Sequence, residues 1–187
     1  MQLCGPGEWL FEKHGSRTGR PWRKLHISVD AGTELIMAAT LTTRDIDAAP
    51  QVGPLLDQVI APVASFTVDD AYDQDGAFGE VAARWPAAAV VVPPRPSAVP
   101  SATAKAAPTQ REQNLRTVAE RGRLRWQKVS GYRSRALVEA GISRLRRVSG
   151  GALRSRTDDR RAPEVAVAVG VLNRMLELGR PEYVRIK

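Results

Sequence analysis

The chain has 187 residues, a net charge of +8 and a single cysteine. Its apolar fraction of 43% is enough for a hydrophobic core and argues against wholesale disorder. One cysteine excludes an internal disulfide framework and a cysteine-based zinc cluster, and it fits a reducing cytosol. The longest apolar runs, residues 87–92 and 165–172, are too short to cross a bilayer. The surplus of basic residues makes a polyanion the first partner to consider.

The N-terminal part of the chain predicts an antiparallel β-meander. Residues 8–14 and 24–30 are expected to be strands, the second because apolar and polar side chains alternate along it. Asp30-Ala31-Gly32-Thr33 is typical of a tight turn. Residues 34–41 then form the returning strand.

The next stretch predicts helices alternating with buried strands. Residues 46–60 have the spacing of a helix, although two prolines must be accommodated. Residues 63–68 are a short apolar run that stops at Asp69-Asp70, which predicts a buried strand with acids at its C-terminal tip. A helix over residues 73–84 and a second buried strand over residues 87–92 follow.

A proline-rich segment separates this region from a helical C-terminal part. Residues 93–108 contain five prolines among mostly Ala, Ser and Thr, which predicts a mobile loop or linker. Helices are expected at residues 111–121, 131–148 and 163–178. Strands alternating with helices indicate an α/β protein, and the initial meander indicates a mixed sheet.

Acidic and basic residues are separated along the sequence. Ten acids and only one base lie between Asp30 and Glu80, whereas twelve bases and three acids lie between Arg123 and Arg161. Eleven of those twelve bases are arginines, which can bind phosphate through two parallel hydrogen bonds. The acidic part could hold metal cations and the basic part phosphates, or both could be ordinary solvated surfaces.

Four residues of the helix predicted at 131–148 stand out by their chemistry. Tyr132, Arg135, Glu139 and Arg146 follow one another at intervals of three, four and seven, which places them on one side of that helix. A carboxylate between arginines is most often a structural ion pair, and a functional site is the alternative.

This pattern, Tyr132-x2-Arg135-x3-Glu139-x6-Arg146, resembles the tyrosine–arginine–glutamate–lysine signature of bacterial insertion-sequence DDE transposases. The similarity is strongest to the insertion-sequence-five group, and it covers nearly the whole chain apart from the proline-rich segment. Other motifs resemble those of that group in the same order: Gly7-Glu8-Trp9, Trp22-Arg23-Lys24-Leu25-His26, Leu41-Thr42-Thr43, Val68-Asp69-Asp70-Ala71-Tyr72-Asp73, Pro93-Pro94-Arg95 and Leu172-Asn173-Arg174-Met175.

The resemblance implies a ribonuclease H-like α/β fold, in which a mixed sheet is flanked by helices and lacks its first strand. Residues 1–187 would form one partial catalytic domain, with a proline-rich mobile insert at 93–110. In such transposases two Asp and one Glu bind two divalent ions, Mg²⁺ or Mn²⁺, for cleavage and strand transfer at insertion-sequence ends.

Carried over by position, Asp69 is the second acid and Glu139 the third, so both are expected to be catalytic metal ligands. The partner implied is double-stranded DNA, bound by a homodimer in the cytoplasm at the nucleoid. The residues expected to bind DNA are Tyr132, Arg135, Arg144, Arg146, Arg147, Arg154 and Arg156.

The sequence departs from the family pattern at its first acid. In the family this Asp precedes the segment that matches Gln2-Leu3-Cys4-Gly5, so we expect an N-terminally truncated copy. Three hypotheses follow: an enzyme of DNA transposition or a piece of one, a catalytically inactive DNA-binding remnant, and a fragment that does not fold stably. We therefore expect the chain to belong to the transposase family of the first hypothesis. Because the Asp is missing, we expect this chain alone to behave as an inactive DNA-binding remnant or as an unstable fragment.

Several other residues have both a functional and a structural interpretation. Asp70 replaces a glycine of the family, and solvent exposure is favoured over a ligand role. Asp30 is expected to be structural, and His14 and His26 are expected to be ordinary strand residues rather than metal ligands. The four tryptophans could stack on bases, but burial is the preferred interpretation: Trp9, Trp22, Trp85 and Trp126.

Overall fold

The structure, a computed structural model, describes residues 2–3, 22–101, 104, 108–150 and 152–179. The strand predicted at residues 8–14, with Trp9 and His14, lies outside the described residues. The chain divides into two compact units. Unit 1 comprises Met1–Asp45 and Glu139–Lys187, and unit 2 comprises Ile46–Val138.

The protein is α/β, as predicted, but its described strands form two small sheets instead of one mixed sheet. Strands joined by a tight turn pair antiparallel, whereas parallel pairing needs a longer crossover. The tight turn joins the strands of the antiparallel sheet, and the longer crossover joins the strands of the parallel pair.

Unit 1 contains the antiparallel hairpin that the sequence predicts, with a further short strand, β1, paired to it. Its strands are paired in the order β1-β2-β3, and their bounds are β1 Gln2–Leu3, β2 Arg23–Val29 and β3 Ile36–Thr43. The turn between β2 and β3 is closed by Asp30, whose Oδ2 accepts hydrogen bonds from the Thr33 amide at 2.8 Å and the Thr33 hydroxyl at 2.6 Å. The structural role expected for Asp30 is therefore confirmed.

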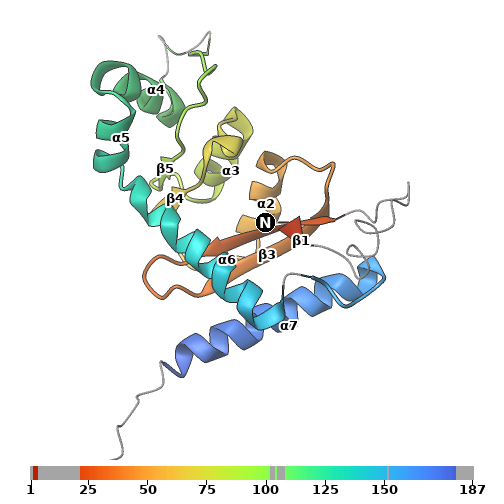
Figure 1. Cartoon of the computed structure of the whole chain (residues 1–187). Helices are drawn as coiled ribbons and strands as arrows, with labels where there is room; N and C mark the ends of the chain where they lie inside the picture. Colours follow the sequence, from red (N-terminus) through yellow and green to blue (C-terminus); the bar gives the residue numbers. More distant parts are fainter. Residues whose placement is uncertain (1, 4–21, 102–103, 105–107, 151, 180–187) are drawn as a thin grey trace, which may run out of the picture. The chain divides into compact units, whose positions relative to one another are not determined.

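Two helices cover this hairpin within unit 1 (Figure 1). They are the part of α6 (Arg135–Ser149) from Glu139 onward and α7 (Asp158–Glu177), which starts before the predicted residue 163. Gly141 brings α6 close to β2, since a Cβ there would lie 3.2 Å from Val29. Asn173 of α7 accepts a hydrogen bond from the Ile36 amide and donates one to the Ile36 carbonyl. The buried core includes Leu25, Ile36, Leu145, Val165 and Leu172.

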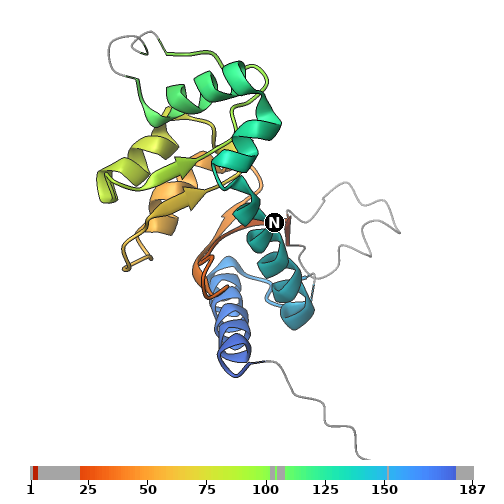
Figure 2. The ribbon, with the colours of Figure 1, turned by 90° about the vertical axis from the view of Figure 1, so that its left-hand side faces the viewer.

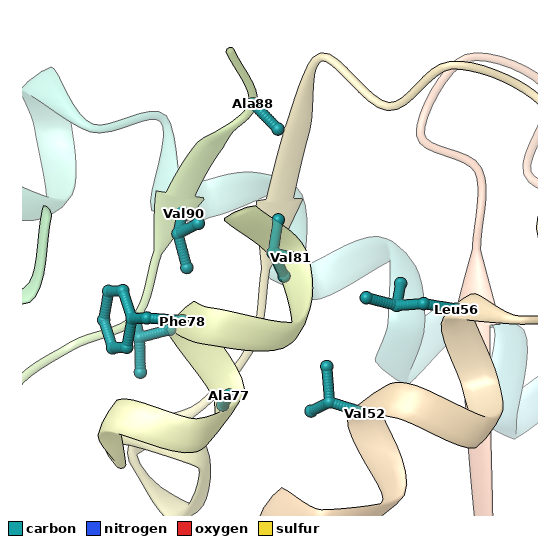
Figure 3. Close-up of a cluster of buried hydrophobic side chains, with 8 residues drawn as sticks. Val52, Leu56, Ala77, Phe78, Val81, Ala88 and Val90 are labelled. Carbon is teal, nitrogen blue, oxygen red and sulfur yellow. The ribbon is translucent and has the colours of Figure 1, made fainter. Parts of the chain in front are cut away.

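Unit 2 is built on a parallel pair, β4 (Ser65–Thr67) and β5 (Ala89–Val91), connected through α3 (Asp75–Arg84). The helix predicted at 46–60 is shorter, because only η1 (Ala49–Gln51) and α2 (Val52–Leu56) are helical. Figure 3 shows side chains of α2, α3 and β5 meeting in one core, whose buried members are Val52, Leu56, Ala77, Phe78, Val81, Ala88, Val90 and Val92.

Side-chain amides complete the hydrogen bonding of β5 on the side away from β4. Gln110 Oε1 accepts from the Val90 amide at 2.7 Å, and Asn114 Nδ2 donates to the Val90 carbonyl at 3.2 Å. Both residues belong to α4 (Gln110–Arg121), which is seen beside β5 in Figure 2. The short helices α5 (Arg123–Val129) and η3 (Tyr132–Ser134) lead from α4 to α6.

The described part of the proline-rich segment is anchored by charged residues of unit 2. The Arg95 amide donates to Asp73 Oδ2 at 2.9 Å, and the Ser101 amide donates to Glu112 Oε1 at 3.3 Å. Glu112 is buried and forms a capping box with Thr109 at the start of α4. Hydrogen bonds from Thr109, together with the amide of Ser101, lower the pKa of Glu112 to about 2. The mobility expected for residues 93–110 stays a prediction.

Candidate functional site

Asp69 stands directly beyond β4, as the sequence predicts. It is the N-cap of the one-turn helix η2 (Asp70–Tyr72), and its Oδ1 accepts a hydrogen bond from the Ala71 amide at 3.1 Å. Its side chain is 39% exposed. The carboxylate is thus fixed at one oxygen and accessible from solvent.

Arg135 is the charged neighbour of Asp69 within unit 2. Its Nη2 lies 3.6 Å from Asp69 Oδ2, close enough for an ion pair but longer than a hydrogen bond. The preceding residue, Ser134, places its hydroxyl 3.5 Å from the hydroxyl of Thr67 at the end of β4. The start of α6 and the tip of β4 are therefore neighbours, and two predicted site residues meet there.

Glu139 lies one turn after Arg135 in the continuous helix α6, and Arg146 follows it two turns later. Both Glu139 and Arg146 are exposed. The boundary between the units falls just before Glu139, so Asp69 belongs to unit 2 and Glu139 to unit 1.

Tyr132 is positioned by an aromatic contact that the sequence does not reveal. Its ring lies 5.4 Å from that of Trp126, at an interplanar angle of 44°. Trp126 is fully buried, and its indole N–H donates to Asn114 Oδ1 at 3.0 Å. Burial, opposed in part by Arg135, raises the pKa of Tyr132. The interpretation of Trp126 as a core residue is confirmed, and Asn114 joins the residues that support this region.

The arginines expected to bind DNA fall into two groups in the structure. Arg144 is half-buried and forms an ion pair with Glu34, so its charge is already compensated within unit 1. The others beyond Glu139 are exposed, and they are Arg146, Arg147, Arg154 and Arg156. Exposed guanidinium groups of this kind can reach phosphates.

Two further residues behave as the structural interpretation predicts. His26 is buried in β2, and its Nε2 lies 3.0 Å from the Thr42 hydroxyl. Burial, with nearby positive charge, lowers the pKa of His26 from 6.5 to about 4. Asp70 is exposed.

Asp69 has the chemistry of a ligand for a hard divalent cation. Its carboxylate belongs to a side chain that is partly exposed to solvent, and Mg²⁺ and Mn²⁺ prefer oxygen ligands. Across the described ranges, no three His, Cys, Asp or Glu side chains gather as a metal site. Asp69 therefore fits as one ligand of a site whose remaining ligands must be supplied by other residues.

A family model described as a transposase DDE domain matches residues 1–174. The chain therefore belongs to the transposase DDE domain family, whose members act on DNA and generally use divalent metal ions. No solved structure matches the chain. In the described part of the chain, no helix combines the length and apolar character that a membrane span requires.

Proposed function

We propose that the chain serves DNA transposition through metal-dependent phosphodiester cleavage and strand transfer at insertion-sequence ends. The observation that supports this most directly is the meeting of Asp69 and Arg135. An acid at the tip of a strand and an arginine one turn before Glu139 are the arrangement that the insertion-sequence-five resemblance implies. The same resemblance suggests a ribonuclease H-like fold and a homodimer on DNA.

In this proposal Asp69 and Glu139 are two of the three carboxylates that hold the metal ions. The bound ions would supply activation of water or a DNA 3′-hydroxyl and stabilisation of the leaving oxygen. Arg135 and Arg146 would bind DNA phosphates next to these carboxylates. Tyr132 would contact the DNA backbone beside the same phosphates. A complete site of this kind requires a third carboxylate besides Asp69 and Glu139.

Metal binding tests the two ligands directly. We expect Asp69→Asn and Glu139→Gln each to weaken Mn²⁺ binding at least about tenfold, because even the loss of an outer hydrogen-bond partner has effects of that order. Binding is measured from the loss of the free Mn²⁺ signal in electron paramagnetic resonance. Asp70→Asn is the matched control, since this neighbouring carboxylate is exposed and outside the proposed site. Equal effects of the changes at positions 69 and 70 would show that the assignment is wrong.

The second candidate function is DNA binding without cleavage. It is favoured by the same ion pair, because a guanidinium that stays against Asp69 competes with a cation for this carboxylate. A supercoiled plasmid carrying the element ends, with Mg²⁺ or Mn²⁺, separates the candidates. Nicking by the wild type that disappears in Asp69→Asn supports the enzyme. Binding of the plasmid by the protein without any nicking supports the DNA-binding remnant.

A further inference from the structure

The direction of the Asp69 carboxylate depends on the short helix that follows it. Asp69 Oδ1 accepts a hydrogen bond from the amide of Ala71, the second residue of η2. The helix itself is only one turn long, and its internal bonds join Tyr72 to Asp69 and Asp73 to Asp70, at 3.2 and 3.1 Å. One turn has little stability of its own, so other groups must hold it in place.

Arg95, which lies in the segment that follows β5, supplies that support. Its Nε donates to the Asp70 carbonyl and its Nη2 to the Ala71 carbonyl, both at 2.8 Å. The guanidinium therefore bridges two successive carbonyls of η2. The Asp70 carbonyl thus accepts from two donors, the Asp73 amide and Arg95 Nε, and a planar two-pronged guanidinium suits two neighbouring carbonyls.

Arg95 is in turn anchored to a buried ion pair. Its backbone amide donates to Asp73 Oδ2 at 2.9 Å, and Asp73 Oδ1 accepts from Arg111 Nε at 2.7 Å. The Asp73 side chain is only 1% exposed. A hydrogen-bonded charge pair at such a site is costly to disturb, so the backbone of Arg95 has a fixed place beside η2.

We propose that Arg95 is a positioning residue for Asp69, acting through the carbonyls of Asp70 and Ala71. This inference rests on the proposed function, in which Asp69 is a metal ligand. Arg95 does not contact the metal in this scheme. It keeps η2 formed, and η2 presents the Ala71 amide that orients the carboxylate.

Two measurements on the full chain test this role. Without metal, Arg95→Ala is expected to speed amide hydrogen exchange at Ala71 at least about tenfold, because the turn that holds this amide against Asp69 Oδ1 loses its external support. With Mn²⁺, the same change is expected to raise the dissociation constant by about 10- to 100-fold, the usual effect of losing an outer partner of a ligand. Arg95→Lys should recover part of both effects, since an ammonium can still donate to a carbonyl.

Arg84→Ala is the matched control. Arg84 is also an arginine of unit 2, and it forms surface ion pairs with Asp57 and Glu80 without contacting η2. Unchanged Ala71 exchange in Arg95→Ala, or an equal acceleration in Arg84→Ala, would overturn the proposal. The exchange result is independent of metal, so it remains decisive even if Asp69→Asn binds Mn²⁺ normally and the proposed function itself fails.

Discussion

His26 illustrates how the surroundings of a single residue set the pH dependence of stability. Its folded-state pKa is lowered from 6.5 to about 4, so the folded protein favours the neutral ring. The stabilisation is fully present above the unfolded pKa and is lost as the pH falls toward the folded one. We expect the free energy of unfolding to drop by about 2 kcal/mol between about pH 7 and pH 5.

Chemical denaturation of the wild type and of His26→Gln at both pH values measures this effect. Glutamine can keep a hydrogen bond to Thr42 but does not titrate, so the variant should lose most of the drop over this interval. A variant with the same pH dependence as the wild type would assign the effect to other groups.

At the scale of residues, local chemistry was predictable and distant pairing was not. The turn role of Asp30 follows from residues within the turn itself, and the structural role of His26 follows from the strand pattern around it. The ion pair between Arg144 and Glu34 joins residues far apart in the sequence, so nothing near Arg144 indicates it. The contact of Trp126 with Tyr132 also depends on how η3 turns back toward α5.

At the scale of elements, Asn114 links three parts of unit 2. Its amide donates to the Val90 carbonyl of β5 and accepts from the Trp126 indole of α5. We expect Asn114→Ala to lower the free energy of unfolding by about 2 kcal/mol, because two buried polar groups lose their partner. The better helix propensity of alanine recovers only about 0.5 kcal/mol.

Gln113→Ala provides the comparison for Asn114→Ala in urea denaturation. Gln113 is the preceding residue of α4 and is exposed, so its replacement should change stability little. A loss at position 113 as large as that at position 114 would show that the helix, rather than the bridge, determines the result.

Element types were predicted better than their lengths and partners. Periodicity indicates β2, β3, α4 and α6 within a few residues of their bounds. The helix predicted at 46–60 is confined to residues 49–56, and both of its prolines lie inside this helical part. The hydrogen bonds of Gln110 and Asn114 to the backbone of β5 could not be predicted. Side-chain amides that bond to a strand produce no periodic pattern in the sequence.

At the scale of the whole molecule, the surplus of positive charge makes DNA binding sensitive to salt. Each phosphate contact releases counterions, so the logarithm of affinity falls linearly with the logarithm of salt concentration. We expect the double change Arg146→Gln and Arg147→Gln to weaken binding to duplex DNA and to reduce this slope by about two, since both side chains are exposed.

Fluorescence anisotropy with labelled duplex DNA over a range of salt concentrations gives the slope. Arg44→Gln is the matched control, because this exposed arginine also belongs to unit 1 but is paired with Asp45. Binding that is independent of salt, or a slope changed equally by both variants, would contradict a phosphate role for Arg146 and Arg147.

The division of unit 1 into two sequence segments has a consequence for the order of folding on the ribosome. Unit 2 is contiguous, so all of Ile46–Val138 can emerge and fold before unit 1 is complete. The β2–β3 hairpin is made early, but Leu145, Val165 and Leu172, which bury Leu25 and Ile36, come last. At about 5–20 residues per second, synthesis from the end of the hairpin to Leu172 takes roughly 6 to 26 seconds, and the apolar face of the hairpin is uncovered during this time. That interval is when a nascent chain of this protein is most exposed to chaperones and to aggregation.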